Sequence, residues 1–506
     1  MVEPMPVGRR SFAYGLLGAL SIPFSLRPPG EEWTFEESQG QWLPTVSDGT
    51  AYVVGEDGAL HALDSSGERL WRFEYEDAGL VREPAVVDGE CFTVSADDKI
   101  LRIDIETGEQ HGHIDVSDEG SPGPPLVYGG VCYVQTTQTL LAIDYLNDER
   151  LWADERGARD GEAVPATDGE TLVVFGGETA YAYELTTGEL LWELEQSARS
   201  AARAPMLHED RVFLNYWGGT LVCADLETGE RLWEYTSERF DRGAIVPIVH
   251  DDVVVISGRI SRPETGWRGV AVGIDRTGSE PEHRWTVTHG GQMLRDGTRV
   301  GDTVILSADR AILAIDAETG GYEQLHNETT LYGSVLLADG YLYGNRRPDL
   351  NAMFAIELED MSGEYGSRGS HAANAHHDKW EERARPRVDS LTIDVTPDSP
   401  EVGDEVTTEV TAHFESDIEL DVTEEATLAV ADGEPGENET VPIESPGTMT
   451  FTAEYRNQSG STTLEIPSDE DDDTEDGMPG AGVVAAATAI GAATYVLARE
   501  TDRSPV

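Results

Sequence analysis

The stretch "ADLETGERLW", residues 224–233, returns along the chain in near copies. These copies are "ALDSSGERLW" at 62–71, "AIDYLNDERLW" at 142–152 and "AYELTTGELLW" at 182–192. Complete and partial copies of the motif share an acidic residue, found at Asp64, Asp104, Asp144, Glu184, Asp225, Asp275, Asp316 and Glu357. The spacings between these acids are 40, 40, 40, 41, 50, 41 and 41 residues. Recurrence at such a period is typical of a repeat architecture, so we expect eight similar units.

Each unit has the pattern of four short strands. An apolar run is followed by "DG" or a near relative, then by a β-branched or aromatic run, and then by the A-x-D strand. After the "ETG" turn comes a strand opened by Trp. Four short strands separated by turn residues at this spacing are typical of a β-propeller blade. The sequence therefore predicts an all-β, eight-bladed β-propeller over residues 32–360.

The recurring residues have structural roles in this prediction. The glycine after Thr allows a positive φ in the turn, and the acid accepts backbone N–H groups there. Each tryptophan has an apolar face too large for one blade to bury, so we expect it to dock between neighbouring blades. The tryptophans of this kind are Trp33, Trp71, Trp152, Trp192, Trp233 and Trp285.

The two ends of the repeat region complement each other. The eighth unit lacks a Trp strand, and "EEWTFEE" at 31–37 matches the surroundings of Trp71 but has no blade before it. We therefore expect residues 32–36 to supply the outer strand of the eighth blade and close the ring.

The signature A-x-D-x-x-T-G-x-x-x-W is matched best at 223–233, 182–192 and 142–152, and it resembles the quinoprotein-type repeat. The resemblance implies one of two classes of protein. The enzymes of this type use pyrroloquinoline quinone (PQQ) and Ca²⁺ to oxidise alcohols or sugars. The non-catalytic members, which include the propeller scaffold of bacterial outer-membrane barrel assembly, bind other proteins.

The sequence favours the non-catalytic class. It has no adjacent cysteines, no CxxCH haem motif and few insertions between strands, apart from "RISRPETGWRG" near 259–269. We assign no catalytic or metal-ligating residue, leave any cofactor-binding residue unknown, and expect no cofactor. A PQQ- and Ca²⁺-dependent oxidoreductase stays the alternative. The inserted stretch is expected to form a contact loop.

Charge limits the range of partners. The chain has 97 acidic and 35 basic residues, a formal net charge of −62, and Lys99 and Lys379 are its two lysines. Such a charge repels phosphate backbones, so we expect no nucleic-acid binding. The even spread of acids and the scarcity of lysine resemble proteins of salt-loving archaea, in which molar salt screens the self-repulsion.

Cysteine and histidine provide weaker candidates. Cys91, Cys132 and Cys223 are widely spaced and form no known framework, so we expect buried apolar roles, with a redox or disulfide role as the alternative. Residues 361–387 are interpreted as a linker. Four potential transition-metal ligands in it, which we expect to be solvated, are His371, His376, His377 and Asp378.

The ends of the chain resemble sorting signals. Residues 1–30, with Arg9 and Arg10 before an apolar run, resemble a twin-arginine export signal. An acidic spacer at 468–478 precedes an apolar stretch at 479–498, which is long enough for a transmembrane helix and resembles an archaeal surface-sorting anchor. Residues 499–506 then form a cytoplasmic tail, because arginines follow the span. Sequons for glycosylation stand at Asn327, Asn438 and Asn457.

Residues 388–467 alternate polar and apolar side chains and predict a small β-sandwich of immunoglobulin type. The sequence as a whole favours a single-pass membrane protein with an extracellular propeller that binds an unidentified protein or ligand. A structural surface-layer or adhesion component is the third interpretation.

Overall fold

The structure, a computed structural model, describes residues 33–358, 365–366 and 386–467. Within these ranges the longer gaps are 38–43, 159–163, 197–203, 241–246, 291–296, 347–351 and 432–439, and gaps of one to four residues occur elsewhere. Helix in the described residues is limited to two 3₁₀ turns, η1 (Ser117–Glu119) and η2 (Glu155–Gly157). The protein is therefore an all-β structure.

Eight sheets, numbered 1 to 8 here, share a plan of four antiparallel strands. Strands consecutive in the chain lie side by side in each sheet, except that β1 completes sheet 8 and a fifth strand joins sheet 7. Sheet 1 contains β2 (Thr45–Ser47), β3 (Thr50–Val54), β4 (Leu60–Leu63) and β5 (Arg69–Phe73). Sheet 2 contains β6 (Ala85–Val87), β7 (Glu90–Val94), β8 (Lys99–Asp104) and β9 (Gln110–Asp115). Sheet 3 contains β10 (Leu126–Tyr128), β11 (Val131–Gln135), β12 (Leu140–Asp144) and β13 (Glu149–Asp154). Sheet 4 contains β14 (Ala166–Thr167), β15 (Thr171–Gly176), β16 (Thr179–Glu184) and β17 (Leu190–Glu195).

The second half of the ring repeats the plan. Sheet 5 contains β18 (Met206–His208), β19 (Arg211–Tyr216), β20 (Thr220–Asp225) and β21 (Arg231–Thr236). Sheet 6 contains β22 (Ile248–His250), β23 (Val253–Arg262), β24 (Gly266–Asp275) and β25 (Glu282–His289). Sheet 7 contains β26 (Thr298–Val300), β27 (Thr303–Ala308), β28 (Ala311–Asp316) and β29 (Tyr322–His326). Sheet 8 contains β30 (Leu331–Ala338), β31 (Tyr341–Arg346), β32 (Met353–Glu357) and, from the start of the chain, β1 (Trp33–Phe35).

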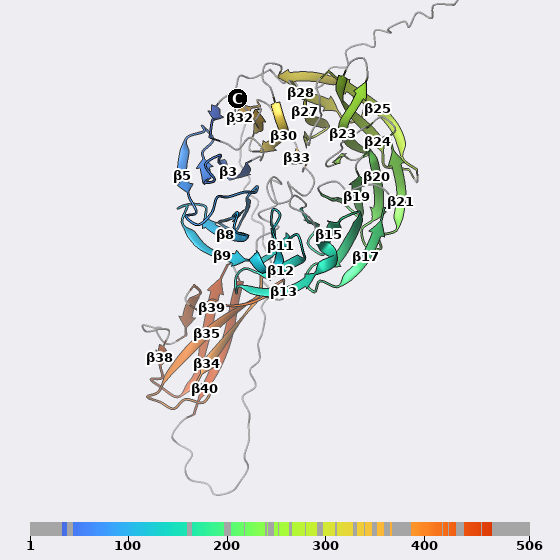
Figure 1. Cartoon of the computed structure of the whole chain (residues 1–506). Helices are drawn as coiled ribbons and strands as arrows, with labels where there is room; N and C mark the ends of the chain where they lie inside the picture. The colour runs from blue at the N-terminus through green and yellow to red at the C-terminus, as the bar shows by residue number, and fades with distance from the viewer. Residues whose placement is uncertain are drawn as a thin grey trace, which may run out of the picture.

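The sheets stand around a ring, with the fourth strands at its rim (Figure 1). This is the arrangement of a β-propeller. The burial of the strands follows from it. The middle strands, such as β15, are buried on both faces, whereas the rim strand β17 alternates exposed and buried residues. The core accordingly lies between neighbouring sheets, as where Phe175 and Trp192 of sheet 4 meet Val212 and Leu214 of sheet 5.

The pairing expected between the two ends of the repeat region is present. β1 pairs with β32, with Trp33 opposite Ala355 and Phe35 opposite Met353. The strand that precedes sheet 1 in the chain thus completes sheet 8, and the ring is held shut by backbone hydrogen bonds between its ends.

The segment interpreted as a linker contributes one short strand that the sequence did not indicate. β33 (Tyr365–Gly366) pairs with β26, with Tyr365 opposite Val300, and adds a fifth strand to sheet 7. Because β26 is the first strand of its sheet, this pairing brings the chain back to the inner edge of the ring (Figure 1).

Residues 386–467 form a second unit, called the C-terminal β-domain below. One of its sheets contains β34 (Val388–Thr396), β35 (Glu405–Phe414), β36 (Glu419–Asp421) and β38 (Thr440–Pro442). The other contains β37 (Thr427–Val430), β39 (Gly447–Tyr455) and β40 (Gln458–Ile466). Alternate residues of both sheets, among them Val406, Val410 and Phe451, are fully buried. The domain lies beside sheets 2 and 3 (Figure 1).

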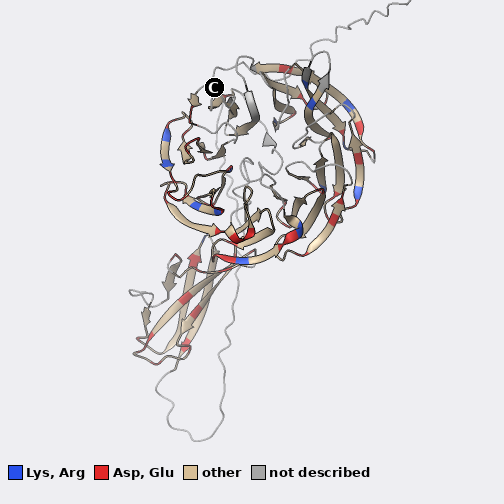
Figure 2. Ribbon diagram, in the orientation of Figure 1, with Lys and Arg blue, Asp and Glu red and all other residues tan. Residues whose placement is uncertain are grey.

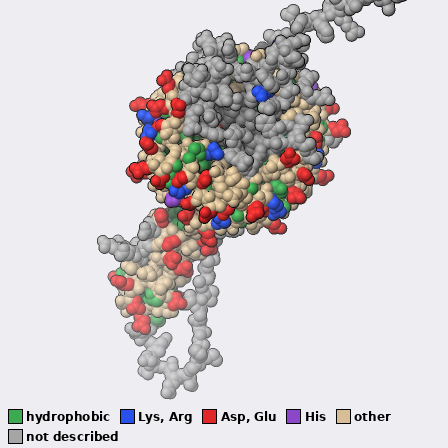
Figure 3. Space-filling view, viewed as in Figure 1, with side chains coloured by type: hydrophobic (Ala, Val, Ile, Leu, Met, Phe, Trp, Pro, Cys, Tyr) green, Lys and Arg blue, Asp and Glu red, His purple; other side chains and the backbone are tan. Residues whose placement is uncertain are grey.

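Acidic side chains occur on the ring and on the C-terminal β-domain alike (Figure 2). On the face seen in Figure 3 they spread over the described surface rather than gather in one patch. Among the described residues, no helix has the length and hydropathy of a membrane span. The predicted export signal at 1–30, the acidic spacer at 468–478, the span at 479–498 and the tail at 499–506 lie outside the described residues.

Candidate functional site

The acids of the A-x-D strands cap the turns between third and fourth strands. Asp225 Oδ1 accepts hydrogen bonds from Thr228 N at 2.8 Å and Thr228 Oγ1 at 2.7 Å. Equivalent bonds are made by Asp64, Asp104, Asp144, Glu184, Asp275 and Asp316. Glu357 ends β32, and residues 359–364, which would form its turn, are outside the described part. The bonds from Thr228 lower the pKa of Asp225, so this carboxylate is ionised and committed to its turn.

The tryptophans join neighbouring sheets through two contacts. Trp192 Nε1 donates to Leu226 O of sheet 5 at 2.8 Å. Its ring covers Gly229, whose φ is +69° and where an added Cβ would lie 2.6 Å from Trp192 Cγ. The same two contacts join Trp33 to Ser65 and Gly67, Trp71 to Ile105 and Gly108, Trp152 to Leu185 and Gly188, and Trp285 to Ala317 and Gly320. The glycine is thus needed for its backbone conformation and for its lack of a side chain.

The small residue of the A-x-D strand lies opposite the tryptophan of its own sheet. Ala182 pairs with Trp192, and Gly273 pairs with Trp285, where an added Cβ would lie 2.2 Å from the ring. Cys223 takes this position opposite Trp233. All three cysteines are free thiols and fully buried, and burial raises the pKa of Cys132 and of Cys223 to about 12. The described contacts give these thiols a packing role.

Sheet 2 has no tryptophan, and an arginine makes its joint instead. Arg102 stands at the small-residue position, opposite Gly112 at the tryptophan position. Its guanidinium donates to Tyr145 O of sheet 3, lies 4.9 Å from the centroid of the Tyr145 ring, and pairs with both oxygens of Glu90 at 3.0 Å. In sheet 2 the large side chain thus lies on the third strand and the small residue on the fourth, which reverses the arrangement of the tryptophan joints. Sequence reasoning missed this role, although the coincidence of "RID" with a missing Trp was the available signal.

The joint between sheets 5 and 6 differs again. The turn after Asp275 is one residue shorter than the turn after Asp225, since Gly278 follows it by three positions and Gly229 follows by four. By analogy with the other joints, Trp233 of sheet 5 would donate to the carbonyl of Arg276. That carbonyl instead accepts from Arg211 Nη1 at 2.9 Å. Trp233 Nε1 is buried and finds no acceptor among the described residues. Among the described tryptophans of the repeat, Trp233 is thus the one whose ring nitrogen does not donate to the next sheet.

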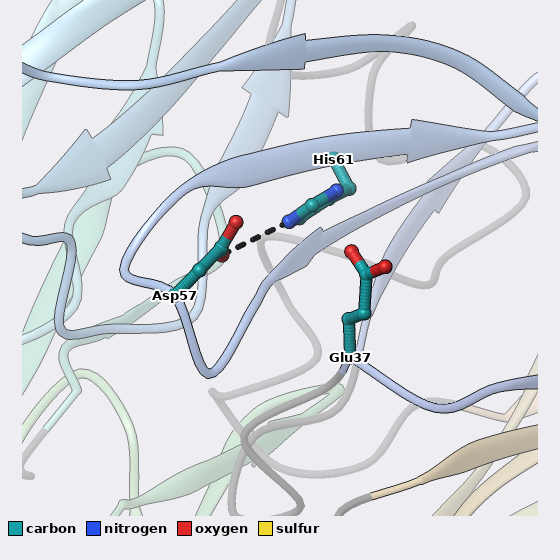
Figure 4. Close-up of side chains that lie close together, drawn as sticks. All are labelled: Glu37, Asp57 and His61. Carbon is teal, nitrogen blue, oxygen red and sulfur yellow. Dashed lines mark hydrogen bonds and ion pairs between the residues drawn. The ribbon is translucent and has the colours of Figure 1, made fainter.

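One cluster of potential metal ligands occurs in the described residues, at Glu37, Asp57 and His61 (Figure 4). Glu37 follows the closing strand β1, while Asp57 and His61 belong to the β3–β4 hairpin of sheet 1. His61 is fully buried, and its Nε2 lies 3.1 Å from Asp57 Oδ1. The three donor groups lie within 4.8 Å of one another.

Two arginines already satisfy this cluster. Arg72 donates twice to Asp57 Oδ2, at 2.7 and 2.9 Å, and Arg69 donates to Glu37 Oε2 at 3.1 Å. Arg69 Nη1 also lies 3.4 Å from His61 Nδ1. Because arginine has only donors, Nδ1 accepts and Nε2–H donates to Asp57, which leaves the ring without a lone pair for a metal.

The cluster therefore acts as a clasp for the closing strand. Glu56 N donates to Glu37 O at 2.7 Å, and the Phe35 ring lies 5.0 Å from the His61 ring. Burial lowers the pKa of His61, so its ring is neutral at pH 7. Burial also opposes ionisation of Asp57, but bonds from Ala59, Arg72 and His61 outweigh it and lower the pKa to about 2.

The remaining sequence candidates lie outside the described residues. These are Arg9, Arg10, His371, His376, His377, Asp378, Asn327, Asn438 and Asn457. The inserted stretch near 259–269 extends β23 and β24 to ten residues each. It forms a long hairpin within sheet 6 rather than a separate loop, because the added residues continue the strand pairing from Arg259 to Arg262.

The ring of four-stranded sheets joined through A-x-D and Trp contacts defines a β-propeller built from PQQ-like repeats. The chain belongs to the family described as outer membrane protein assembly factor BamB, whose model matches residues 29–144 and 136–362. No curated protein shows significant sequence similarity to the chain.

Solved structures share this fold. BamB from Moraxella catarrhalis is 17% identical, with 66% of this chain and 98% of that chain covered and a TM-score of 0.52. The quinohemoprotein alcohol dehydrogenase from Comamonas testosteroni is 15% identical, with 65% and 76% covered and a TM-score of 0.52. The dehydrogenase ADHIIG from Pseudomonas putida HK5 is 15% identical, with 66% and 77% covered and a TM-score of 0.52. At these identities the likeness concerns the fold.

Proposed function

We propose that this chain is a non-catalytic, eight-bladed propeller scaffold at the outer surface of a salt-loving archaeal cell, where it binds a protein or ligand partner. In this proposal residues 1–30 direct export and residues 479–498 anchor the chain in the membrane, with 499–506 in the cytoplasm. The C-terminal β-domain, of immunoglobulin type, stands between the anchor and the ring.

The use of the signature residues carries the proposal. The carboxylates of the A-x-D strands are held in turns, the tryptophans are held between sheets, and both carboxylates of the Glu37 and Asp57 pair accept from guanidinium groups. A quinone enzyme needs carboxylate oxygens free to hold Ca²⁺ and to remove a proton from substrate. The Glu37 cluster does not fit a Ca²⁺ site in the described arrangement, because its charge is already balanced by Arg69 and Arg72.

The short connections support the same proposal. Between the second and third strands, the turns run from two residues (177–178) to six (347–352). The match also covers 98% of the BamB chain but 76% and 77% of the two dehydrogenases, which have additional regions without a counterpart here. A compact ring offers broad faces for a macromolecule, whereas active sites are commonly built from longer loops.

The first test separates the scaffold from the oxidoreductase. Purified full-length chain, kept in detergent at high salt, is titrated with PQQ and Ca²⁺ and assayed for dye reduction with alcohols and sugars. We expect no bound chromophore and no turnover. Stoichiometric PQQ binding together with dye reduction would replace the scaffold by the oxidoreductase.

The second test addresses binding and location. A photo-reactive residue is placed at exposed Glu178, in the β15–β16 turn, and cross-linked in intact cells. We expect an adduct of one discrete mass that is lost when excess purified ring-bearing chain competes. A chain truncated before residue 468 should leave the envelope fraction and appear outside the cell. Retention of the truncated chain in the cytoplasm would count against the proposal. So would the absence of an adduct at Glu178 and at the other exposed turns on the face of the ring that carries the β15–β16 turn.

A further inference from the structure

The C-terminal β-domain contacts the ring at three turns. Ser416 Oγ donates to Gly129 O, in the β10–β11 turn, at 2.6 Å. Asn147, in the β12–β13 turn, donates through Nδ2 to Glu419 O at 3.0 Å. Arg456 Nη1 pairs with Asp88 Oδ2, in the β6–β7 turn, at 2.7 Å. Each contact joins residues far apart in the chain, so the two units share a defined surface.

Apolar packing accompanies these polar contacts. Ile418 is buried, and a Cβ added at Gly130 would lie 3.1 Å from Ile418 Cδ1. Leu146 packs against the same cluster, which runs without a break from sheets 2 to 4 into the core of the C-terminal β-domain. Continuous burial of this kind is a property of domain interiors rather than of two units on a flexible tether.

The third repeat departs from the pattern where this contact occurs. The turn position held by Asp48 in sheet 1 and Asp88 in sheet 2 is Gly129 in sheet 3, so no carboxylate lies beside Ser416, which donates to the Gly129 carbonyl. The Thr-Gly of most other turns is Asn147-Asp148 here, and the amide of Asn147 donates to Glu419 O while also donating to Asp144 Oδ2 at 2.8 Å. These substitutions therefore serve the contact with the C-terminal β-domain.

Topology assigns all of these contacts to one face of the ring. In a meander of four antiparallel strands, the first and third turns lie at one end and the second turn at the other. The contacting turns are the first turns of sheets 2 and 3 and the third turn of sheet 3. The long β23–β24 hairpin is a second turn, so it extends from the opposite face.

We propose that the turns of sheets 2 and 3 are a docking surface for the chain's own C-terminal β-domain, so that the two move as one body and the face with the β23–β24 hairpin is turned away from that domain. This arrangement holds whether the ring is a scaffold or an enzyme. It directs the opposite face toward any partner that approaches from beyond the domain.

An engineered disulfide tests the docking. A Cβ built at Gly129 lies 3.6 Å from Ser416 Cβ, which is within the separation that disulfides require. The backbone at Gly129 has φ +60°, close to the +46° of Asp48 and +53° of Asp88 at the equivalent turns, so this turn can hold a non-glycine residue, at some cost in stability for cysteine. The native cysteines are fully buried and do not compete. The test variant is the full chain with Gly129→Cys and Ser416→Cys.

Asp48→Cys with Ser416→Cys is the matched control, since it uses the same turn of sheet 1. We expect mild oxidation to cross-link the first pair nearly completely and the control pair at least tenfold less, as measured by non-reducing electrophoresis and peptide mass spectrometry. Small-angle scattering of the reduced and oxidised forms should then coincide. Equal cross-linking of both pairs, no cross-link in a variant with unchanged urea midpoint, or a marked compaction on oxidation would each overturn the proposal.

Discussion

The contact between Trp192 and Gly229 allows backbone strain and steric overlap to be separated in one experiment. Gly229→Ala places a methyl group 2.6 Å from Trp192 Cγ and Cδ2, at a backbone φ of +69°. The left-handed backbone costs an L-residue about 1–2 kcal/mol of unfolding free energy. The overlap with the ring adds about 1–3 kcal/mol, the range for an overpacked core. We therefore expect a loss of about 2–5 kcal/mol.

Three further variants isolate the steric part. Gly49→Ala has a φ of +75° and no atom within 4 Å of the added Cβ, so only the backbone cost of about 1–2 kcal/mol should appear. Trp192→Ala alone should cost about 3–5 kcal/mol, because a buried ring and its hydrogen bond to Leu226 O are lost. In that background Gly229→Ala should cost only the backbone part, which gives a coupling of about 1–3 kcal/mol.

Urea unfolding at fixed high salt, with midpoint and slope compared among the four variants, measures these differences. Equal losses at Gly49 and Gly229, or strict additivity of Gly229→Ala and Trp192→Ala, would refute the joint between tryptophan and glycine. The reasoning would also be refuted if Gly229→Ala were more costly without Trp192 than with it.

Three other predictions use the same unfolding assay. Deletion of residues 31–38 removes β1, and we expect a loss larger than that of Trp33→Ala, whose partly buried ring should cost less than the roughly 3–5 kcal/mol of a fully buried one. An unchanged midpoint would contradict closure by β1. Arg102→Ala should cost about 3 kcal/mol of unfolding free energy, since Glu90 loses its partly buried partner. Adding Gly112→Trp and Asp148→Gly should recover part of this loss, because the two changes rebuild the ordinary tryptophan joint. No recovery would refute the idea that Arg102 replaces the tryptophan. The pKa of His61 is lowered by burial, so protons bind the unfolded chain more tightly and stability should fall as the pH drops below about 6.5. His61→Gln should lose this part of the pH dependence. A wild-type stability that rises on acidification relative to the variant would contradict the prediction.

The repeat and the closing strand could be predicted because each depends on local pattern. Four-stranded units follow from turn residues and alternation, and the role of Trp33 follows from one missing strand at the other end of the region. Both inferences need only the order of strands. The only spatial assumption is that sheets consecutive in the chain are neighbours in the ring.

The clasp and the docking surface could not be predicted, since they depend on residues that are distant in the chain and ordinary in type. Arg69 and Arg72 are two among many exposed charges until the fold brings Glu37 and Asp57 beside them. The contact between Gly129 and Ser416 joins residues 287 positions apart. The strand β33 was missed for a related reason, because two residues carry no periodicity.

The departures from the repeat follow one another in a physical sequence. Sheet 2 has Gly112 at the position where six of the other sheets have Trp, and sheet 7 has Gln324 there. The glycine that would receive the ring from sheet 2 lies in sheet 3 and is therefore under no steric demand. Asp148 occupies that position with a φ of +61°, which keeps the left-handed turn without needing the space. Asn147, the preceding residue of the same turn, stands where most other turns have Thr and binds the C-terminal β-domain. The missing tryptophan of sheet 2 explains why the next turn can hold Asp148 in place of glycine, so a missing signature residue is best interpreted together with the residue it would have touched in the next unit.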